Sequence, residues 1–318
     1  MKAPDISVVI CFFGDYCNFA QQCLSSLVAQ EFKDFEVVLI LDGPTRFRSQ
    51  LYNDLKSSGL NFTFIENPKN LSLLQSRSRA ASRANGTYLA FLDHDDTYTP
   101  NFLAELHQTA QVMHADVVEC PIFEYEIDGT LSRSRRFRTD KLRTDEEILL
   151  CYLIGRSANN LVTKLVRKAV WDRSCGELMA DLKNAYVNYA EDILFTVSVY
   201  KHARVYATTS DTHYNYIKRP SSSVNPHSLD VVRNSASQLQ VVLDYVERNS
   251  QYLLAPDAIA AFFRREAAWG LDHLDRRLTH IASRTRLSPH SVHQCRQRIA
   301  AMRKRYLEKY LRPSPAKT

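Results

Sequence analysis

The sequence predicts an α/β fold of the doubly wound type, a mostly parallel sheet flanked by helices, followed by an all-helical appendage. Two observations lead to this prediction. Over residues 6–123, short apolar runs of strand length alternate with stretches of helical periodicity in the order βαβαβαβαβ. Beyond residue 225 the apolar residues recur only at helical spacing. We therefore expect two domains, residues 1–225 and residues 226–318.

The individual elements follow from apolar runs and from the residues that end them. Strands are expected at residues 6–13, 35–41, 61–65, 88–92, 117–123 and 204–208. Helices are expected at residues 16–27, 46–57, 73–84, 100–113, 145–154, 189–202, 232–246, 257–283 and 289–311. A strand followed by a helix and a further parallel strand is the repeating unit of a doubly wound, mostly parallel sheet.

Length and composition exclude several classes of protein. The 318 residues exceed a typical single domain, and 45% hydrophobic with 24% charged residues argue against extensive disorder. No apolar stretch approaches the roughly 20 residues of a spanning helix. The first apolar run is too short for a signal peptide, so we expect a cytoplasmic protein. The seven cysteines include no Cys-x-x-Cys pair, which argues against a disulfide framework or a zinc cage.

Positive charge is concentrated near the C-terminus. Residues 260–318 hold 14 Lys or Arg against 4 Asp or Glu, which leaves 27 against 31 for residues 1–259. Residues 292–310 are predicted to form a basic amphipathic helix. Its apolar stripe either packs on the preceding helices or attaches to an anionic membrane surface, such as the inner face of the plasma membrane. No nucleic-acid recognition motif accompanies the charge, so nucleic acid is not an expected partner.

A second basic segment, residues 128–144, is rich in arginine and should form a loop or hairpin over the sheet edge. Its arginines are interpreted either as a solvated face or as contacts to an acceptor or a phosphate.

An acidic cluster, Asp93–Asp96, directly follows the fourth expected strand. Ligands bind at the carboxyl edge of parallel sheets, and three carboxylates within four residues repel one another unless a cation joins them. Oxygen ligands suit Mg²⁺ or Mn²⁺. The alternative is a helix N-cap, with Asp96 or Thr97 capping the helix near Pro100.

Several short segments form an ordered set around this cluster. They are, in chain order, SVVICFFGDY, FEVVLILDGP, Asn70-Leu71-Ser72, Arg77 ahead of Gly86-Thr87-Tyr88, and FLDHDD. As a set, over about residues 6–103, they resemble the family 2 glycosyltransferases of the GT-A fold. The resemblance implies transfer of a sugar from a nucleotide donor in the synthesis of bacterial capsule, O-antigen or exopolysaccharide.

The resemblance also implies roles for particular residues. Phe12 and Asp42 would line the nucleobase and ribose pocket, and Arg77 would lie near the base or the diphosphate. Asp93 would hold the ribose and, together with Asp95, the metal. Without the family pattern, Asp42 would be a turn-forming Asp-Gly and Arg77 part of a solvated helix face.

A second motif, Glu191-Asp192-Ile193-Leu194-Phe195, resembles the Glu-Asp-x-x-Phe motif of the same family, in which the aspartate is the general base. Inverting transfer needs one carboxylate that takes the proton of the acceptor hydroxyl. Asp192 is the predicted base and Glu191 the alternative. Both would also complement the dipole at the start of a helix.

Further downstream, residues 212–224 resemble the loop that closes over the donor in relatives. Arg219 in this segment would pair with the diphosphate and stabilise its leaving charge. His213 is either an additional metal ligand or a structural side chain.

Together these features predict an inverting, metal-dependent hexosyltransferase that uses a nucleotide-diphosphate sugar, with a UDP-sugar as the expected donor. The acceptor would be a hydroxyl of a glycan or a lipid-linked saccharide. Three alternatives remain: a nucleotidyltransferase on a similar sheet, a polyanion-binding protein, and a catalytically dead glycan-binding module. A nucleotidyltransferase would be expected to carry a glycine-rich phosphate loop, which the sequence lacks.

Overall fold

The computed structural model describes residues 2–14, 18–135, 143–183, 185–219, 228–253, 255–284 and 288–311. The chain forms two compact units. The first comprises Met1–Ile148, Asn159–Val187 and Ser198–Arg219, and the second comprises Leu149–Ala158, Asn188–Val197 and Pro220–Thr318. The predicted domain boundary at residue 225 lies outside the described residues.

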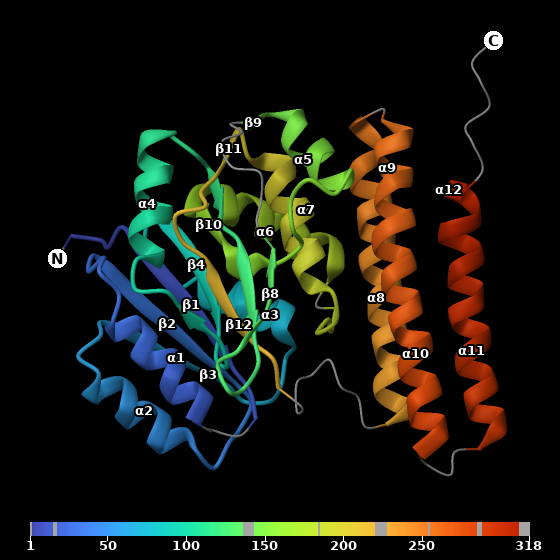
Figure 1. Ribbon diagram of the computed structural model, residues 1–318, viewed down its shortest axis with the longest axis horizontal. Helices are drawn as coiled ribbons and strands as arrows, with labels where there is room; N and C mark the ends of the chain where they lie inside the picture. Colours follow the sequence, from blue (N-terminus) through green and yellow to red (C-terminus); the bar gives the residue numbers. More distant parts are fainter. Residues whose placement is uncertain are drawn as a thin grey trace. The chain divides into compact units, whose positions relative to one another are not determined.

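The first unit contains a large mixed sheet (Figure 1). Among the described residues its strands follow the order β3-β2-β1-β4-β10-β6-β11-β9. These strands are β1 (Ile6–Phe12), β2 (Phe35–Asp42), β3 (Phe62–Asn67), β4 (Tyr88–Asp93), β6 (Val117–Glu119), β9 (Arg143–Thr144), β10 (Lys164–Arg167) and β11 (Val205–Thr208). The first four are mutually parallel, whereas β10 runs antiparallel to both of its neighbours. The α/β class predicted from the sequence is confirmed.

Helices pack on both faces of this sheet, whose central strands are mostly apolar and almost entirely buried. Every residue of β1 and β2 is buried, as expected for parallel strands with packing on both faces. Helix α3 contacts β1 and β2, α4 contacts β6, β10 and β11, and α6 contacts β4 and β10. The helices of this unit are α1 (Asn18–Val28), α2 (Arg48–Ser57), α3 (Leu73–Ala81), α4 (Phe102–Val112) and α6 (Lys168–Leu182), with a 3₁₀ turn at Leu161–Thr163.

The expected strand at residues 117–123 is wrong as a single element. It divides into β6 and β7 (Ile122–Tyr125), which belong to different sheets. The break falls at Cys120 and Pro121, because proline has no N–H to donate to a ladder. The smaller sheet has the order β5-β12-β7-β8, with β5 (Thr97–Tyr98), β8 (Leu131–Arg135) and β12 (Tyr214–Ile217).

The arginine-rich segment at residues 128–144 forms the expected hairpin in part. Strand β8 pairs antiparallel with β7, and Arg133 lies exposed on it. Arg136, Arg138 and Lys141 lie outside the described residues.

Two helices, α5 (Glu146–Leu153) and α7 (Glu191–His202), contribute residues to both units.

The second unit is helical, as predicted. It contains α8 (Leu229–Ser250), α9 (Pro256–Phe262), α10 (Ala268–Arg284), α11 (Pro289–Arg303) and α12 (Lys309–Leu311), with a 3₁₀ turn at Gln251–Leu253 and π-helical segments at Phe263–Ala267 and Lys304–Glu308. Helices α8, α10 and α11 contact one another (Figure 1). Gly270 permits the close approach of α10 to α8, since a Cβ there would lie 3.0 Å from Leu239 Cδ2.

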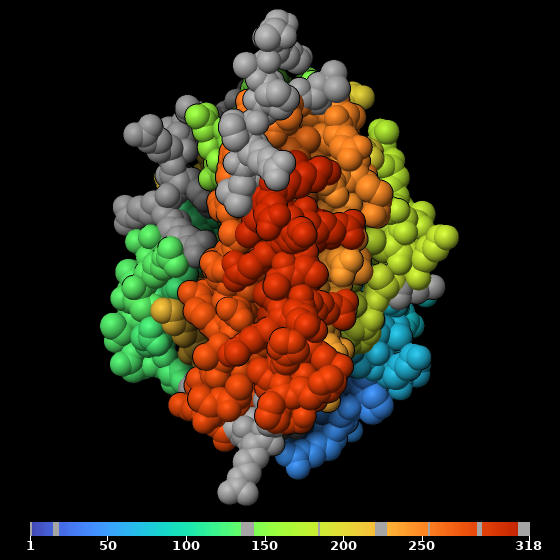
Figure 2. All heavy atoms as spheres, turned by 90° about the vertical axis from the view of Figure 1, so that its right-hand side faces the viewer, coloured from blue at the N-terminus to red at the C-terminus, as the bar shows by residue number. Residues whose placement is uncertain are grey.

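The basic C-terminal helix is a packing element. Figure 2 shows α11 lying over its neighbouring helices, and its apolar stripe faces inward. The buried members of this stripe are Cys295, Ile299, Met302 and Tyr306. Three of its cations pair with acidic residues of α8 and α10: Arg303 with Asp272, Arg305 with Asp244, and Lys309 with Glu247. Within the described part of the chain, no helix combines the length and apolarity that crossing a bilayer would require.

Candidate active site

Three adjacent strands end at the edge where the sequence predicts a ligand. β1 lies between β2 and β4, with Phe12 in register with Leu41 and Cys11 with Asp93. The ends of these parallel strands therefore bring Phe12, Asp42 and Asp93 to one edge of the sheet. In doubly wound sheets this carboxyl edge is where ligands bind.

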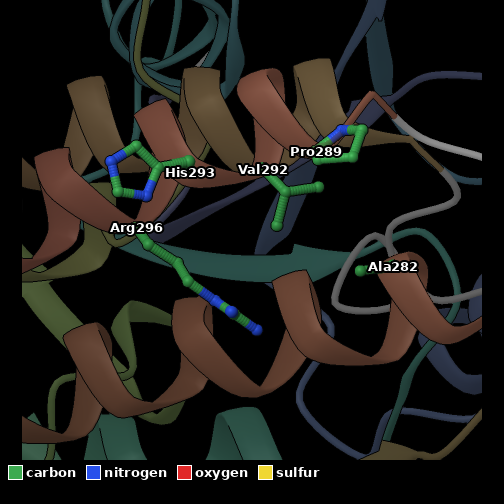
Figure 3. A pocket seen from close by; sticks show the side chains of 5 residues that line it. All are labelled: Ala282, Pro289, Val292, His293 and Arg296. Atoms are coloured by element: carbon green, nitrogen blue, oxygen red, sulfur yellow. The ribbon is translucent and has the colours of Figure 1, made fainter.

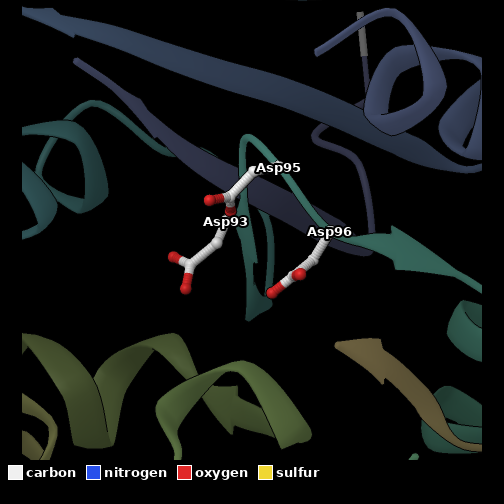
Figure 4. Close-up of side chains that lie close together, drawn as sticks. All are labelled: Asp93, Asp95 and Asp96. Carbon is white, nitrogen blue, oxygen red and sulfur yellow. The ribbon is translucent and has the colours of Figure 1, made fainter. Parts of the chain in front are cut away.

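The acidic cluster forms a tight turn between β4 and β5. The Asp96 N–H donates to the carbonyl oxygen of Asp93 at 3.1 Å, which closes the turn. Figure 4 shows the carboxylates of Asp93, Asp95 and Asp96 projecting from it. One oxygen of each lies within 4.8 Å of those of the other two, a spacing that could hold a metal ion. The alternative N-cap interpretation is wrong, because α4 begins after Asn101.

Asp96 has a structural role in this turn. Its Oδ2 accepts a hydrogen bond from the Tyr214 hydroxyl at 2.8 Å, and its Oδ1 accepts one from the Ile217 N–H at 2.8 Å. The Tyr214 oxygen also accepts from the Asp93 N–H at 3.3 Å. Burial, followed by the charge of Asp93, raises the pKa of Asp96 well above its usual range. Asp96 thus fastens β12 to the acidic turn, and Asp93 and Asp95 remain for a ligand.

Arg77 reaches this turn from helix α3. Its Nη2 donates to Oδ1 of Asp93 at 2.7 Å, and the Arg77 side chain is only 3% exposed. A solvated helix face is therefore the wrong interpretation of Arg77. The buried guanidinium fixes the carboxylate at the end of β4.

A second cation faces the neighbouring carboxylate. Arg219 forms an ion pair with Asp95, and both side chains are largely buried. The Arg219 guanidinium also lies 5.4 Å from the centre of the Phe19 ring. Asp93 and Asp95 are thus each matched by one arginine. A divalent cation would leave this group of four side chains with a net positive charge, which favours an anionic partner such as a diphosphate.

Asp42 is buried and is bound by donors from the chain itself. Its Oδ1 accepts from Asn67 Nδ2 at 2.9 Å and from the Leu71 N–H at 2.8 Å, and its Oδ2 accepts from Asn70 Nδ2 at 3.0 Å. Gly43 follows with a φ of 106°, and a Cβ there would lie 3.0 Å from the Asn70 nitrogen. Asp42 therefore holds the loop that leads into α3. Its role in the nucleobase and ribose pocket stays a prediction.

Phe12 points into the protein. It is fully buried, and its ring centre lies 4.8 Å from that of His94. Burial lowers the pKa of His94 to about 4, so this imidazole is neutral near pH 7. The neighbouring Phe13 is 59% exposed. A role for Phe12 in base binding stays a prediction.

His213 lies against an aromatic ring. Its imidazole stacks on Phe123 at 4.0 Å, and its Nε2 is 3.5 Å from the Tyr125 hydroxyl. It is absent from the group of potential metal ligands among the described residues. The structural interpretation of His213 is favoured.

Glu191 and Asp192 occupy the first turn of α7, in residues that belong to the second unit. The residue before them, Ala190, has a φ of 62°. The approach to the helix is held by Gln238 of α8, whose Oε1 accepts from the N–H groups of Asn188 at 2.7 Å and Tyr189 at 2.9 Å. The assignment of the base to Asp192 stays a prediction.

Sequence reasoning missed Asn67 and Gln238, and it placed Tyr214 in the donor loop without its contact to Asp96. Gln238 carried no motif signal that separated it from ordinary helix residues. Asn67 was detectable in principle, because it ends β3 beside Asp42 at the end of β2.

Parallel strands that end at carboxylates paired with arginines are typical of a nucleotide-binding α/β protein. The family described as glycosyl transferase family 2 matches residues 7–165, half of the chain. The chain belongs to this family, and its fold is GT-A.

Known relatives agree with this assignment. The uncharacterized glycosyltransferase EpsJ of Bacillus subtilis is 22% identical over 219 residues, which is 69% of this chain and 62% of EpsJ. The chain spans 50% and 62% of the length of two of the curated relatives that it matches.

Two solved structures share the fold. TarS 1-349 of S. aureus in complex with UDP-GlcNAc has a TM-score of 0.53 and 20% identity, over 96% of this chain and 91% of that one. The mannosyltransferase PcManGT of Pyrobaculum calidifontis, in complex with GDP-Man and Mn²⁺, has a TM-score of 0.54 and 13% identity, over 98% and 85% of the two chains.

Proposed function

We propose that the protein is an inverting, metal-dependent hexosyltransferase that uses a nucleotide-diphosphate sugar, with a UDP-sugar as the expected donor. The observation that carries the proposal is the pair of carboxylates, Asp93 and Asp95, at the carboxyl edge of a family 2 sheet. The UDP-GlcNAc and GDP-Man complexes of the two structural neighbours support a nucleotide-sugar donor.

The residues present fit a hard divalent cation, either Mg²⁺ or Mn²⁺. Carboxylate oxygens are the ligands these ions prefer, and Asp93 and Asp95 lie close enough to share one. Both oxygens of Asp96 are bound by Tyr214 and Ile217, so Asp96 serves as a support. When bound, the metal would neutralise charge on the diphosphate and help it to leave.

The arginines serve the same anionic partner. Arg77 orients Asp93 through its buried hydrogen bond. Arg219 is paired with Asp95 in the structure. We propose that, with the donor present, Arg219 exchanges this carboxylate for a phosphate oxygen and stabilises the leaving diphosphate.

Asp192 is the proposed general base. The oxygen of the acceptor hydroxyl attacks the anomeric carbon and forms the new glycosidic bond, while the bond from that carbon to the diphosphate oxygen breaks. The hydroxyl proton passes to the Asp192 carboxylate, and the nucleoside diphosphate leaves with the bonding electrons. Attack opposite the leaving group inverts the anomeric configuration.

The acceptor is proposed to be a glycan or a lipid-linked saccharide in cell-surface polysaccharide synthesis.

Charge near the C-terminus supports peripheral attachment to an anionic membrane. A hollow of about 400 Å³ is lined by residues of α10 and α11 that include Arg296 and His293. Figure 3 shows the side chains that line it. Because the apolar stripe of α11 is buried, such attachment would rest on charge.

A nucleotide-sugar panel tests the proposal. Thermal unfolding with each donor, with and without Mn²⁺, identifies the ligand because binding to the native state raises the melting temperature. The released product then separates the alternatives. A transferase releases nucleoside diphosphate, and a nucleotidyltransferase would exchange pyrophosphate. Binding without turnover on any saccharide would indicate a dead glycan-binding module.

A further inference from the structure

An aromatic ladder lies in the second unit. Trp269 and His273 are one turn apart on α10, with ring centres 5.1 Å apart and planes inclined by 7°. The Tyr189 ring continues the stack at 6.4 Å from His273, with planes inclined by 11°. Trp269 is 54% exposed, so the ladder leads from solvent at Trp269 to Tyr189, which lies two positions before Glu191.

The inner part of this ladder contains polar atoms without a hydrogen-bond partner in the described part of the chain. The Tyr189 hydroxyl and Nε2 of His273 are buried and have no hydrogen-bond partner among the described residues. Buried polar atoms in native proteins are nearly always paired, so an unpaired cluster points to a water or a ligand that supplies the partner. Arg277, one turn beyond His273, places its guanidinium 5.7 Å from the centre of the Tyr189 ring.

The ladder is joined to the segment that carries the proposed base. Gln238 of α8 accepts from the N–H groups of Asn188 and Tyr189 at 2.7 and 2.9 Å. Three residues after Tyr189 comes Asp192. The backbone that enters α7 is thus held by α8 through Gln238 and by α10 through the rings and Arg277.

We propose that Trp269, His273 and Tyr189 form the subsite for a saccharide ring of the acceptor. This inference rests on the proposed function, since it deepens the acceptor side of the same reaction. The outer indole face is exposed and suits the apolar C–H face of a pyranose. The unpaired atoms of His273 and Tyr189 are buried behind the rings, so they would contact sugar hydroxyls through a bridging water. Arg277 disfavours a cationic occupant and tolerates an acidic sugar.

Tryptophan fluorescence tests the subsite directly. The chain has two tryptophans, and Trp171 is buried, so a saccharide-dependent change should report on Trp269. The probes are methyl glycosides of glucose, galactose, N-acetylglucosamine and glucuronic acid, with sorbitol at equal concentration as the control. We expect a saturable change with at least one glycoside, none with sorbitol, and none in Trp269→Phe.

Two further variants separate binding from folding. Trp269→Ala should weaken glycoside binding by at least about 10-fold, measured by calorimetry. Tyr189→Phe removes only the unpaired hydroxyl, so it should fold normally and bind several-fold more weakly. Tyr252→Ala, which removes another exposed aromatic ring of the second unit, is the matched control and should bind as the parent does.

The outcomes separate this inference from the proposed function. No glycoside response in a chain that binds a nucleotide sugar would overturn the subsite and leave the function standing. A Trp269-dependent response in a chain that binds no donor would support the subsite and contradict the function. If Trp269→Ala instead converts a dimer to a monomer by light scattering, with no glycoside response in the parent, the ring is an interface between copies and the subsite is wrong.

Discussion

Arg77 donates a hydrogen bond from Nη2 to Oδ1 of Asp93 at 2.7 Å, with the arginine 3% and the aspartate 37% exposed at the side chain. A buried cation thus holds the partly exposed carboxylate that we assign to the metal. The pairing links helix α3 to the end of β4. It implies that Arg77 acts on the metal site through Asp93.

Arg77→Leu should therefore lower both stability and metal-assisted binding. Loss of a hydrogen bond to a charged group costs about 1–3 kcal/mol of unfolding free energy. Affinity for UDP in the presence of Mn²⁺ should fall by roughly 10-fold, equivalent to ~1.4 kcal/mol. Denaturant unfolding and calorimetry measure the two effects. Arg83→Leu, at an exposed position beyond the end of α3, is the control. Unchanged Mn²⁺-dependent affinity in folded Arg77→Leu would exclude this role.

Asp192→Asn should separate chemistry from donor binding. The amide keeps the shape and cannot accept the proton, so transfer should fall by roughly 10²- to 10⁴-fold while donor affinity is nearly unchanged. Glu191→Gln is the matched variant on the same turn and should retain most activity. Near-native turnover of Asp192→Asn together with a large loss in Glu191→Gln would move the base to Glu191.

Much of the fold could be predicted because β1, β2 and β4 are mostly apolar runs of strand length, and β2 and β4 end at the site carboxylates Asp42 and Asp93. Strand β10 was missed because it has only four residues and runs against its neighbours. The Asp96 support was also out of reach, since its partner Tyr214 lies 118 positions away and pairs only through the fold.

His273 predicts an acid sensitivity of the second unit. Burial, with the charges of Arg277 and Arg276, lowers the pKa of His273 from its ordinary value of 6.5 to about 4. Between these values the unfolded chain binds a proton that the folded chain does not, so unfolding free energy falls as pH drops from 6.5 towards 4. The melting temperature of His273→Gln should therefore depend less on pH over this range than that of His290→Gln, which alters an exposed histidine. Equal pH profiles of the two variants would contradict the assignment.

If membrane attachment rests on charge, removing exposed cations from the C-terminal helices should weaken binding to anionic liposomes. Arg296 and Lys304 are exposed, and no ion pair of either occurs among the described residues. Their double replacement by Gln should weaken flotation with anionic liposomes at low salt, by about 1 kcal/mol per charge. The control is Lys56→Gln with Lys69→Gln, the same charge change in the first unit. No flotation of the parent at low salt would reject the proposal.

The central claim is that Asp93 and Asp95 bind a divalent cation that recruits a nucleoside diphosphate. Titration calorimetry of UDP into the parent and Asp95→Asn, each with Mn²⁺ and with EDTA, tests it most directly. We expect Mn²⁺ to tighten UDP binding by at least about 10-fold in the parent and to have no effect in Asp95→Asn, because the amide is a weak ligand for a hard cation. An equal Mn²⁺ effect in both proteins would contradict the claim.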